Sequence, residues 1–155
     1  MRKIKVNKSK IQGTGIFAAE NINSGAFVCW LSGRKIRWVY NEKTDREKCA
    51  NWVGIGRDLW IDPEWPISEL NHSCDPNIGL KGKVRFYALK EIKIGDELTF
   101  DYSTAEEATD WSMKCLCGSS NCRKTITSIQ FLPQTVYLAY LPYVPTYFQK
   151  VFNSQ

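Results

Sequence analysis

The pattern of hydrophobic and polar positions predicts a chain built mostly from short β-strands. Residues 3–6 alternate between charged and aliphatic side chains, which is typical of an edge strand. Residues 26–31 form an apolar run that ends at Ser32-Gly33, so we expect residues 35–40 to return beside it as the second arm of a hairpin. Further strands are predicted at residues 16–19, 58–62, 84–88 and 98–102.

Helix is predicted in two places. Asn41 is a suitable cap for a helix over residues 42–52. From Pro133 onward, aromatic residues recur at spacings of three to four, which fits amphipathic helix interrupted at Pro142 and Pro145. We expect these aromatics to dock on the domain, with an exposed homodimer or substrate surface as the alternative. They are Tyr137, Tyr140, Tyr143, Tyr147, Phe148 and Phe152.

Length and composition indicate one globular domain of ordinary size. With 155 residues and 43% hydrophobic side chains, the chain can bury a sizeable core. The longest apolar run, residues 26–31, is far shorter than the roughly 20 residues of a membrane helix. The charged start is not followed by an apolar stretch, so no secretory signal is predicted. We therefore expect a protein of the cytoplasm or nucleus with no membrane partner.

The net charge of +5 is concentrated at the N-terminus. The first ten residues hold five bases and no acid, and the remainder is balanced. Five charges form only a weak footprint for nucleic acid, so a solvated strand is favoured over direct nucleic-acid binding. The bases are Arg2, Lys3, Lys5, Lys8 and Lys10.

Two polar segments are poor core and good candidate sites. The stretch 71–77, Asn-His-Ser-Cys-Asp-Pro-Asn, holds the only histidine of the chain, and Pro76 favours an irregular turn there. Its amide, imidazole and thiol can bind a heterocycle or a metal, although an ordinary polar loop is an equal alternative. The Gly13-Thr14-Gly15 segment allows backbone to lie close to a ligand, but most such pairs are simply turns.

The six cysteines indicate metal binding rather than disulfides. Three of them crowd into a Cys-x-Cys-x4-Cys segment at 115–122. In a reducing compartment such crowding favours a metal site or reactive thiols. Cys29 and Cys49 lie apart from this segment and are interpreted as core thiols.

Taken in order, four motifs resemble those of the SET-domain protein lysine methyltransferases with a post-SET zinc motif, of the compact stand-alone type. They are Gly13-Thr14-Gly15, the Asn-His-Ser-Cys of residues 71–74, the Glu-Leu-Thr-Phe-Asp-Tyr of residues 97–102, and the cysteine segment. The resemblance implies a mainly β SET-domain (β-clip) fold of several small sheets, with a knot-like C-terminal crossing, short helices and a helical C-terminus. It divides the chain into a SET domain (1–112), a zinc-binding segment (113–126) and a helical extension (127–155).

The resemblance also implies roles for individual residues. Tyr102 is the catalytic tyrosine, and Phe100 and Leu31 line the channel for the substrate lysine. Leu31 departs from the family, which usually has a tyrosine there, and Ser68-Glu69 stands where an Arg-Phe pair is common. S-adenosylmethionine is expected at Gln12, Gly13, Thr14, Gly15, Asn71, His72 and Tyr102, and a structural Zn2+ at Cys74, Cys115, Cys117 and Cys122.

The function implied is methylation of a lysine side chain on a protein or peptide substrate with S-adenosylmethionine as donor. Residues 34–67 fall where the family selects its substrate. The alternative is a zinc-stabilised SET module that binds peptide but has lost activity. The presence of Asn71, His72 and Tyr102 favours the enzyme, because a decayed site is expected to lose at least one of them.

Overall fold

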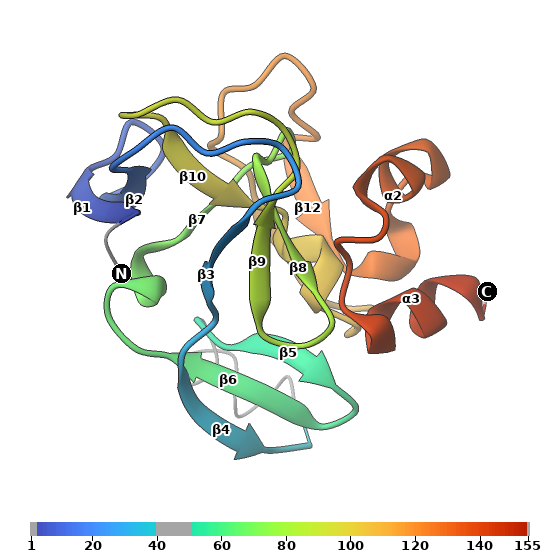
Figure 1. The fold of residues 1–155 in the computed structure, drawn as a ribbon. Coiled ribbons are helices and arrows are strands. Elements are labelled where there is room, and N and C mark those ends of the chain that lie inside the picture. The colour runs from blue at the N-terminus through green and yellow to red at the C-terminus, as the bar shows by residue number, and fades with distance from the viewer. Residues whose placement is uncertain (1–2, 40–50, 155) are drawn as a thin grey trace.

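The computed structural model describes residues 3–39 and 51–154, and its architecture is mainly β. Four small sheets pack around a core of aliphatic side chains, with short helices toward the C-terminus (Figure 1). The predicted fold class is confirmed. The helix expected over residues 42–52 lies almost wholly outside the described residues, as does Cys49.

The first sheet brings two N-terminal strands together with two strands from the middle of the chain. Its strand order is β1-β2-β10-β7, and β7 runs parallel to β10, pairing Asn71 with Thr99 and His72 with Phe100. This pairing places the Asn71 segment beside the end of β10. The strands are β1 (Ile4–Lys8), β2 (Thr14–Ala18), β10 (Glu97–Phe100) and β7 (Asn71–His72).

Two further sheets contradict the predicted hairpin of residues 26–31 with 35–40. Strand β3 pairs with β9, whereas β4 pairs with β6 in another sheet. Gly33 lies so close to β6 that a Cβ there would sit 2.1 Å from the Asp62 carbonyl oxygen. The sheets are β3 (Phe27–Trp30), β9 (Arg85–Ala88) and β8 (Ile78–Lys81), then β4 (Gly33–Arg37), β6 (Leu59–Pro63) and β5 (Val53–Gly56).

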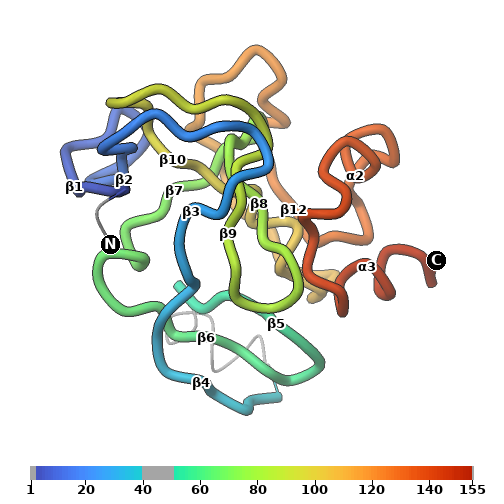
Figure 2. Tube along the Cα trace, in the orientation of Figure 1, coloured from blue at the N-terminus to red at the C-terminus, as the bar shows by residue number. Residues whose placement is uncertain are grey.

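Two connections join the first sheet to the β3-β9-β8 sheet. One leads from β2 to β3 and the other from β9 to β10, and they run side by side (Figure 2). Ile22 and Ile92 meet at their centre, where each N–H donates to the other's carbonyl oxygen at 2.8 and 2.9 Å. Both side chains are buried.

The predicted strand 98–102 ends earlier than expected. Strand β10 stops at Phe100, and Tyr102 begins a 3-10 turn, η2 (Tyr102–Ala105). Asp101 ends the strand because its carboxylate accepts the Ser103 N–H at 3.1 Å, which caps the turn. Tyr102 is therefore carried by a capped turn and not by an alternating strand.

The C-terminal region contains the predicted helices. Helix α2 (Gln134–Tyr140) and helix α3 (Thr146–Asn153) lie at one side of the sheets (Figure 1). Tyr137 and Phe148 are buried in the main core, so docking of this segment is confirmed and the dimer surface finds no support. The remaining elements are β11 (Ser112–Lys114), β12 (Thr125–Thr127), η1 (Ile67–Glu69) and η3 (Ile129–Phe131).

Candidate functional site

An apolar cavity of about 310 Å³ lies at the end of β10. The predicted channel residues Leu31 and Phe100 line it together with Tyr102, and the first two are almost fully buried. Phe86 stacks edge-on against Phe100, with ring centroids 5.4 Å apart. The rim includes residues that the sequence did not single out, namely Trp52, Leu70, Glu106, Trp111 and Met113.

Tyr102 is held rigidly in the wall of this cavity. Its hydroxyl donates to the Leu70 carbonyl oxygen at 2.5 Å, and its backbone N–H donates to His72 Nδ1 at 3.2 Å. Burial raises the pKa of Tyr102 to about 12. The phenol is therefore protonated at neutral pH and can act as a hydrogen-bond donor or acceptor but not as a base.

The predicted cofactor segment and Asn71 are brought together on the other side of β7. The Asn71 amide nitrogen lies 3.2 Å from the Gln12 carbonyl oxygen and 2.8 Å from that of Thr14. It also lies 2.9 Å from the Glu97 carboxylate. A Cβ on Gly15 would approach that carboxylate to 2.3 Å, so any larger residue at this position would force the Glu97 side chain to move.

The sequence analysis did not predict that carboxylates lie beside the Gly13–Gly15 segment. Thr14 donates its hydroxyl to Glu69, and Ser9 donates to Glu97 at 2.8 Å. Glu69 belongs to the Ser68-Glu69 pair, which the sequence analysis noted as a departure from the family that the chain resembles. Two carboxylates therefore lie beside the Gly13–Gly15 backbone, where they would favour a cationic ligand group.

The His72 ring points into the protein. Its Nδ1 accepts the Tyr102 N–H, which places the ring proton on Nε2, and Nε2 lies 3.4 Å from Cys74 Sγ. Burial lowers the pKa of His72 to about 4, so the imidazole is neutral near pH 7. Its side chain links Tyr102 to Cys74 and does not line the cavity.

The four predicted metal ligands converge. The sulfurs of Cys74, Cys115, Cys117 and Cys122 all lie within 4.8 Å of one another. Backbone N–H groups point at the cluster, with Arg123 donating to Cys74 Sγ at 3.4 Å and Lys124 to Cys122 Sγ at 3.4 Å. None of these cysteines forms a disulfide.

The thiols of this cluster differ in acidity. Burial raises the pKa of the Cys74 and Cys115 thiols. For Cys117, burial opposes ionisation, but hydrogen bonds from the Cys74 backbone and from Ser119 outweigh it and lower the pKa to about 6. Cys29, outside the cluster, is a buried core thiol as predicted, and burial raises its pKa to about 12.

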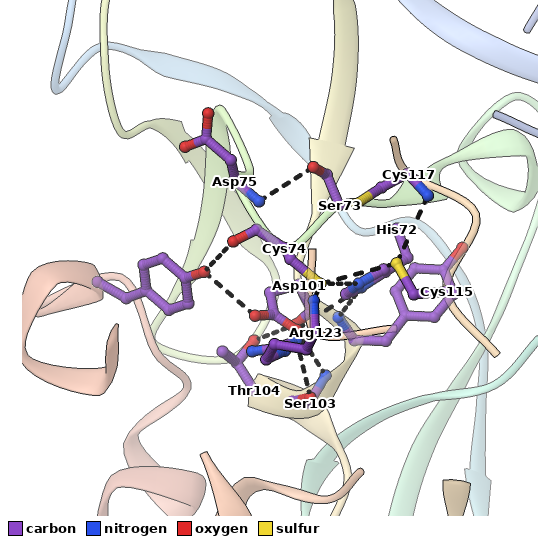
Figure 3. A network of polar contacts seen from close by, with 12 residues as sticks. His72, Ser73, Cys74, Asp75, Asp101, Ser103, Thr104, Cys115, Cys117 and Arg123 are labelled. Carbon is purple, nitrogen blue, oxygen red and sulfur yellow. Dashed lines mark hydrogen bonds and ion pairs between the residues drawn. The ribbon is translucent and has the colours of Figure 1, made fainter. Parts of the chain in front are cut away.

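A buried polar network around Asp101 lies beside the cysteine cluster (Figure 3). Asp101 is 1% exposed and accepts from Arg123 Nη2 at 2.7 Å and from the Tyr140 hydroxyl at 3.2 Å. Arg123 Nη2 also donates to Ser103 at 3.3 Å, whereas Arg123 Nε and Nη1 are buried with no hydrogen-bond partner among the described residues. The sequence analysis did not identify the partners of Asp101.

Comparison with known proteins places these features in a family. The SET-domain family model matches residues 13–103, which include the Gly13–Gly15 segment, Asn71, Asp101 and Tyr102. The chain therefore belongs to the SET-domain family.

Curated relatives are histone methyltransferases. Histone-lysine N-methyltransferase 2B of Homo sapiens is 33% identical over 138 residues, which cover 78% of this chain and 5% of the relative. Histone-lysine N-methyltransferase set1 of Dictyostelium discoideum is 30% identical over 141 residues, covering 81% and 9%. The chain thus spans less than a tenth of the length of these relatives.

Solved structures support the same fold. The structure of ctPRC2 in an autoinhibited conformation bound to S-adenosylmethionine matches with a TM-score of 0.57 and 27% identity, over 69% of this chain and 16% of the other. An active polycomb repressive complex 2 in the basal state matches with a TM-score of 0.54 and 30% identity, over 64% and 15%. In the part of this chain that the structure describes, the helices fall short of the length and hydropathy needed to cross a bilayer.

Proposed function

We propose that this SET domain transfers a methyl group from S-adenosylmethionine to a lysine side chain of a protein substrate. The observation that carries the proposal is the position of Tyr102, whose phenol forms part of the wall of an apolar cavity next to the Asn71 strand. Relatives named histone-lysine N-methyltransferase and a neighbour bound to S-adenosylmethionine support it.

The cofactor is proposed to bind along Gln12, Gly13, Thr14 and Gly15 and beside Asn71. The Glu69 and Glu97 carboxylates near this backbone suit the cationic amino group of the methionine moiety. His72 contributes indirectly, because its Nδ1 accepts the Tyr102 backbone N–H and so holds Tyr102 beside the proposed cofactor site. When bound, S-adenosylmethionine supplies the methyl group.

The cavity suits a lysine side chain because its lining is mainly apolar. A free lysine has a pKa near ~10.4, so presenting a neutral amine at pH 7 costs on the order of 4–5 kcal/mol. Walls formed by Leu31, Phe86 and Phe100 disfavour the ammonium form and lower that pKa. The Tyr102 hydroxyl is then placed to orient the amine, and alignment itself contributes several kcal/mol.

The cysteine cluster is proposed to hold a structural Zn2+. A tetrahedral zinc with Zn–S bonds of about 2.3 Å separates its sulfurs by about 3.8 Å. Cys74 and Cys115 lie 3.7 Å apart, and the backbone N–H donors to the sulfurs would stabilise thiolates. The zinc would join residues 113–126 to the loop that follows β7 and carries Cys74.

The proposed function also suggests domain limits, a substrate class and a cellular location. We infer a SET domain over residues 1–112, a zinc-binding segment over 113–126 and a helical extension over 127–155 that shares the main core. The substrate class is a protein or peptide presenting a lysine, and the setting is intracellular, in the cytoplasm or nucleus. The names of the relatives favour a histone substrate.

The test is transfer of radiolabelled methyl from S-adenosylmethionine to a basic protein mixture that includes histones. The zinc-loaded wild type is expected to label a protein, and Tyr102→Phe is expected to label on the order of 10²-fold less, equal to about 2.7 kcal/mol. Tyr137→Phe, a buried tyrosine away from the cavity, is the matched control and should label like the wild type.

The inactive binding module is the competing function. It would bind histone peptides and S-adenosylmethionine, measured by calorimetry, while labelling nothing. Equal labelling by the wild type and Tyr102→Phe would remove Tyr102 from the catalytic role while leaving the methyltransferase reading in place.

A further inference from the structure

We propose that Tyr140, from helix α2 of the C-terminal extension, is a positioning residue that sets the place of Tyr102. The catalytic role of Tyr102 in this inference rests on the proposed function. Tyr140 lies outside residues 13–103, which match the SET-domain family model. The extension would therefore complete the site, beyond covering the domain with apolar side chains.

The hydroxyl of Tyr140 joins two segments that belong to different parts of the site. Its oxygen lies 3.2 Å from Asp101 Oδ2 and 3.3 Å from the Cys74 carbonyl oxygen, so its single proton is shared between the two acceptors in a bifurcated hydrogen bond. Tyr140 is 9% exposed and Asp101 is 1% exposed, so water does not readily replace this donor. One hydroxyl thus spans the end of β10 and the loop that bears a candidate zinc ligand.

The two carboxylate oxygens of Asp101 accept hydrogen bonds from different donors. Oδ1 accepts from the Ser103 N–H at 3.1 Å and from Arg123 Nη2 at 2.7 Å. Oδ2 accepts from Tyr140, and no second donor to it is found among the described residues. Asp101 and Ser103 flank Tyr102 directly, so the orientation of this carboxylate determines where the turn places the Tyr102 ring.

Arg123 and Tyr140 therefore hold Asp101 from opposite oxygens. The Arg123 contact comes from the cysteine segment, and the Tyr140 contact comes from α2. If the Tyr140 hydroxyl is removed, Arg123 still neutralises the carboxylate, but the carboxylate is free to rotate toward Arg123. Because the Cys74 carbonyl oxygen loses the same donor, the His72–Cys74 loop is released as well.

The clean variant is Tyr140→Phe, which keeps the ring and removes only the hydroxyl. Its matched control is Tyr137→Phe on the same helix, because among the described residues the Tyr137 hydroxyl accepts only a long hydrogen bond, from the Asn153 amide at 3.5 Å. Amide hydrogen exchange by mass spectrometry, on peptides covering residues 71–75 and 99–105, reports the positioning directly. It requires neither activity nor substrate.

We expect Tyr140→Phe to increase exchange in both peptides, with no such change in Tyr137→Phe. Methyl transfer should show about a 10-fold lower kcat in Tyr140→Phe, with KM for the peptide changed less than about 2-fold, because ground-state binding is untouched. Zinc release to a chromogenic chelator should also be faster in Tyr140→Phe than in the control.

The proposal is overturned if both variants exchange alike and lose melting temperature alike, since Tyr140 would then serve only in packing. It is also overturned if Tyr140→Phe exchanges faster yet keeps the wild-type kcat. If the wild type transfers no methyl group, the proposed function fails, while the exchange and zinc-release results still decide whether Tyr140 holds Asp101 and Cys74.

Discussion

Asp101 and Tyr102 are neighbours in the sequence, yet they face opposite kinds of environment. Asp101 is enclosed by polar partners, with Arg123, Ser103 and Tyr140 all donating to it. The Tyr102 hydroxyl donates to the Leu70 carbonyl oxygen, and the rest of the side chain borders an apolar cavity. The polar side defines the geometry, because each buried group there is costly unless its partner is in place. The apolar side is left open to a ligand.

On the polar side, removal of a proposed zinc ligand should have the largest effect. Cys115→Ser is expected to abolish zinc retention and to unfold residues 113–126, because structural zinc sites contribute on the order of 10 kcal/mol. Cys29→Ala, a core thiol outside the cluster, should keep its zinc. Metal content by atomic absorption, measured beside thermal unfolding, checks this. Full zinc occupancy in Cys115→Ser would show that Cys115 is not a ligand.

Removing the carboxylate at the junction should come next. Asp101→Ala leaves Arg123 buried with no counter-charge, which typically destabilises by about 3–5 kcal/mol. The control is Asp75→Ala, whose pair with Lys90 is exposed and contributes about 0–1 kcal/mol. Urea unfolding measures both. Equal losses in the two variants would mean that the Asp101 network does not stabilise the fold.

A methyl group on Gly15 tests the proposed cofactor side. Gly15→Ala would drive a Cβ to within 2.3 Å of the Glu97 carboxylate, so the overpacking is expected to cost about 1–3 kcal/mol and to weaken S-adenosylmethionine binding about 10-fold. Gly13→Ala meets no atom within 4 Å but has a positive φ of 52°, so it pays only backbone strain. Calorimetry compares their cofactor affinities. Unchanged affinity in Gly15→Ala would place the cofactor elsewhere.

The smallest effect is expected inside the cavity. Phe100→Tyr adds one hydroxyl to a residue of the cavity wall that is 2% exposed. The added oxygen takes up cavity space, so we expect products to shift toward monomethyl-lysine. Phe27→Tyr, away from the cavity lining, should leave the products unchanged. Mass spectrometry of the methylated peptide decides, and an unaltered product ratio would remove Phe100 from the channel.

Local patterns predicted much of the fold. The strand at 84–88 and the C-terminal helices were recognised because their apolar spacing is set by the secondary structure itself. The hairpin of residues 26–31 with 35–40 was wrong because β4 instead pairs with β6, through the close approach at Gly33. Such long-range pairing leaves no mark in a short window of sequence.

The candidate site divides in the same way. Cys74 and the cysteine segment were predicted to converge, since the spacing and the family resemblance both indicate a metal, and they do converge. The Asp101, Arg123 and Tyr140 network was missed. Tyr140 fits the apolar periodicity of a docking helix, so nothing in the sequence distinguishes its hydroxyl from that of Tyr137. Arg123 offered a cue, because a charged residue directly after the candidate zinc ligand Cys122 is expected to need an acidic partner.

The two connections that pair at Ile22 and Ile92 are related by an approximate two-fold symmetry. Ala18 and Gly25 flank the first isoleucine, and Ala88 and Gly95 recur at the same offsets around the second. Gly25 donates to the Ala88 carbonyl oxygen and Gly95 donates to that of Ala18, so the two crossings clasp each other reciprocally. The sheets that bear Gly15 and Phe86 cannot swing apart without breaking this clasp on both sides. These reciprocal hydrogen bonds therefore fix the two sheets against each other.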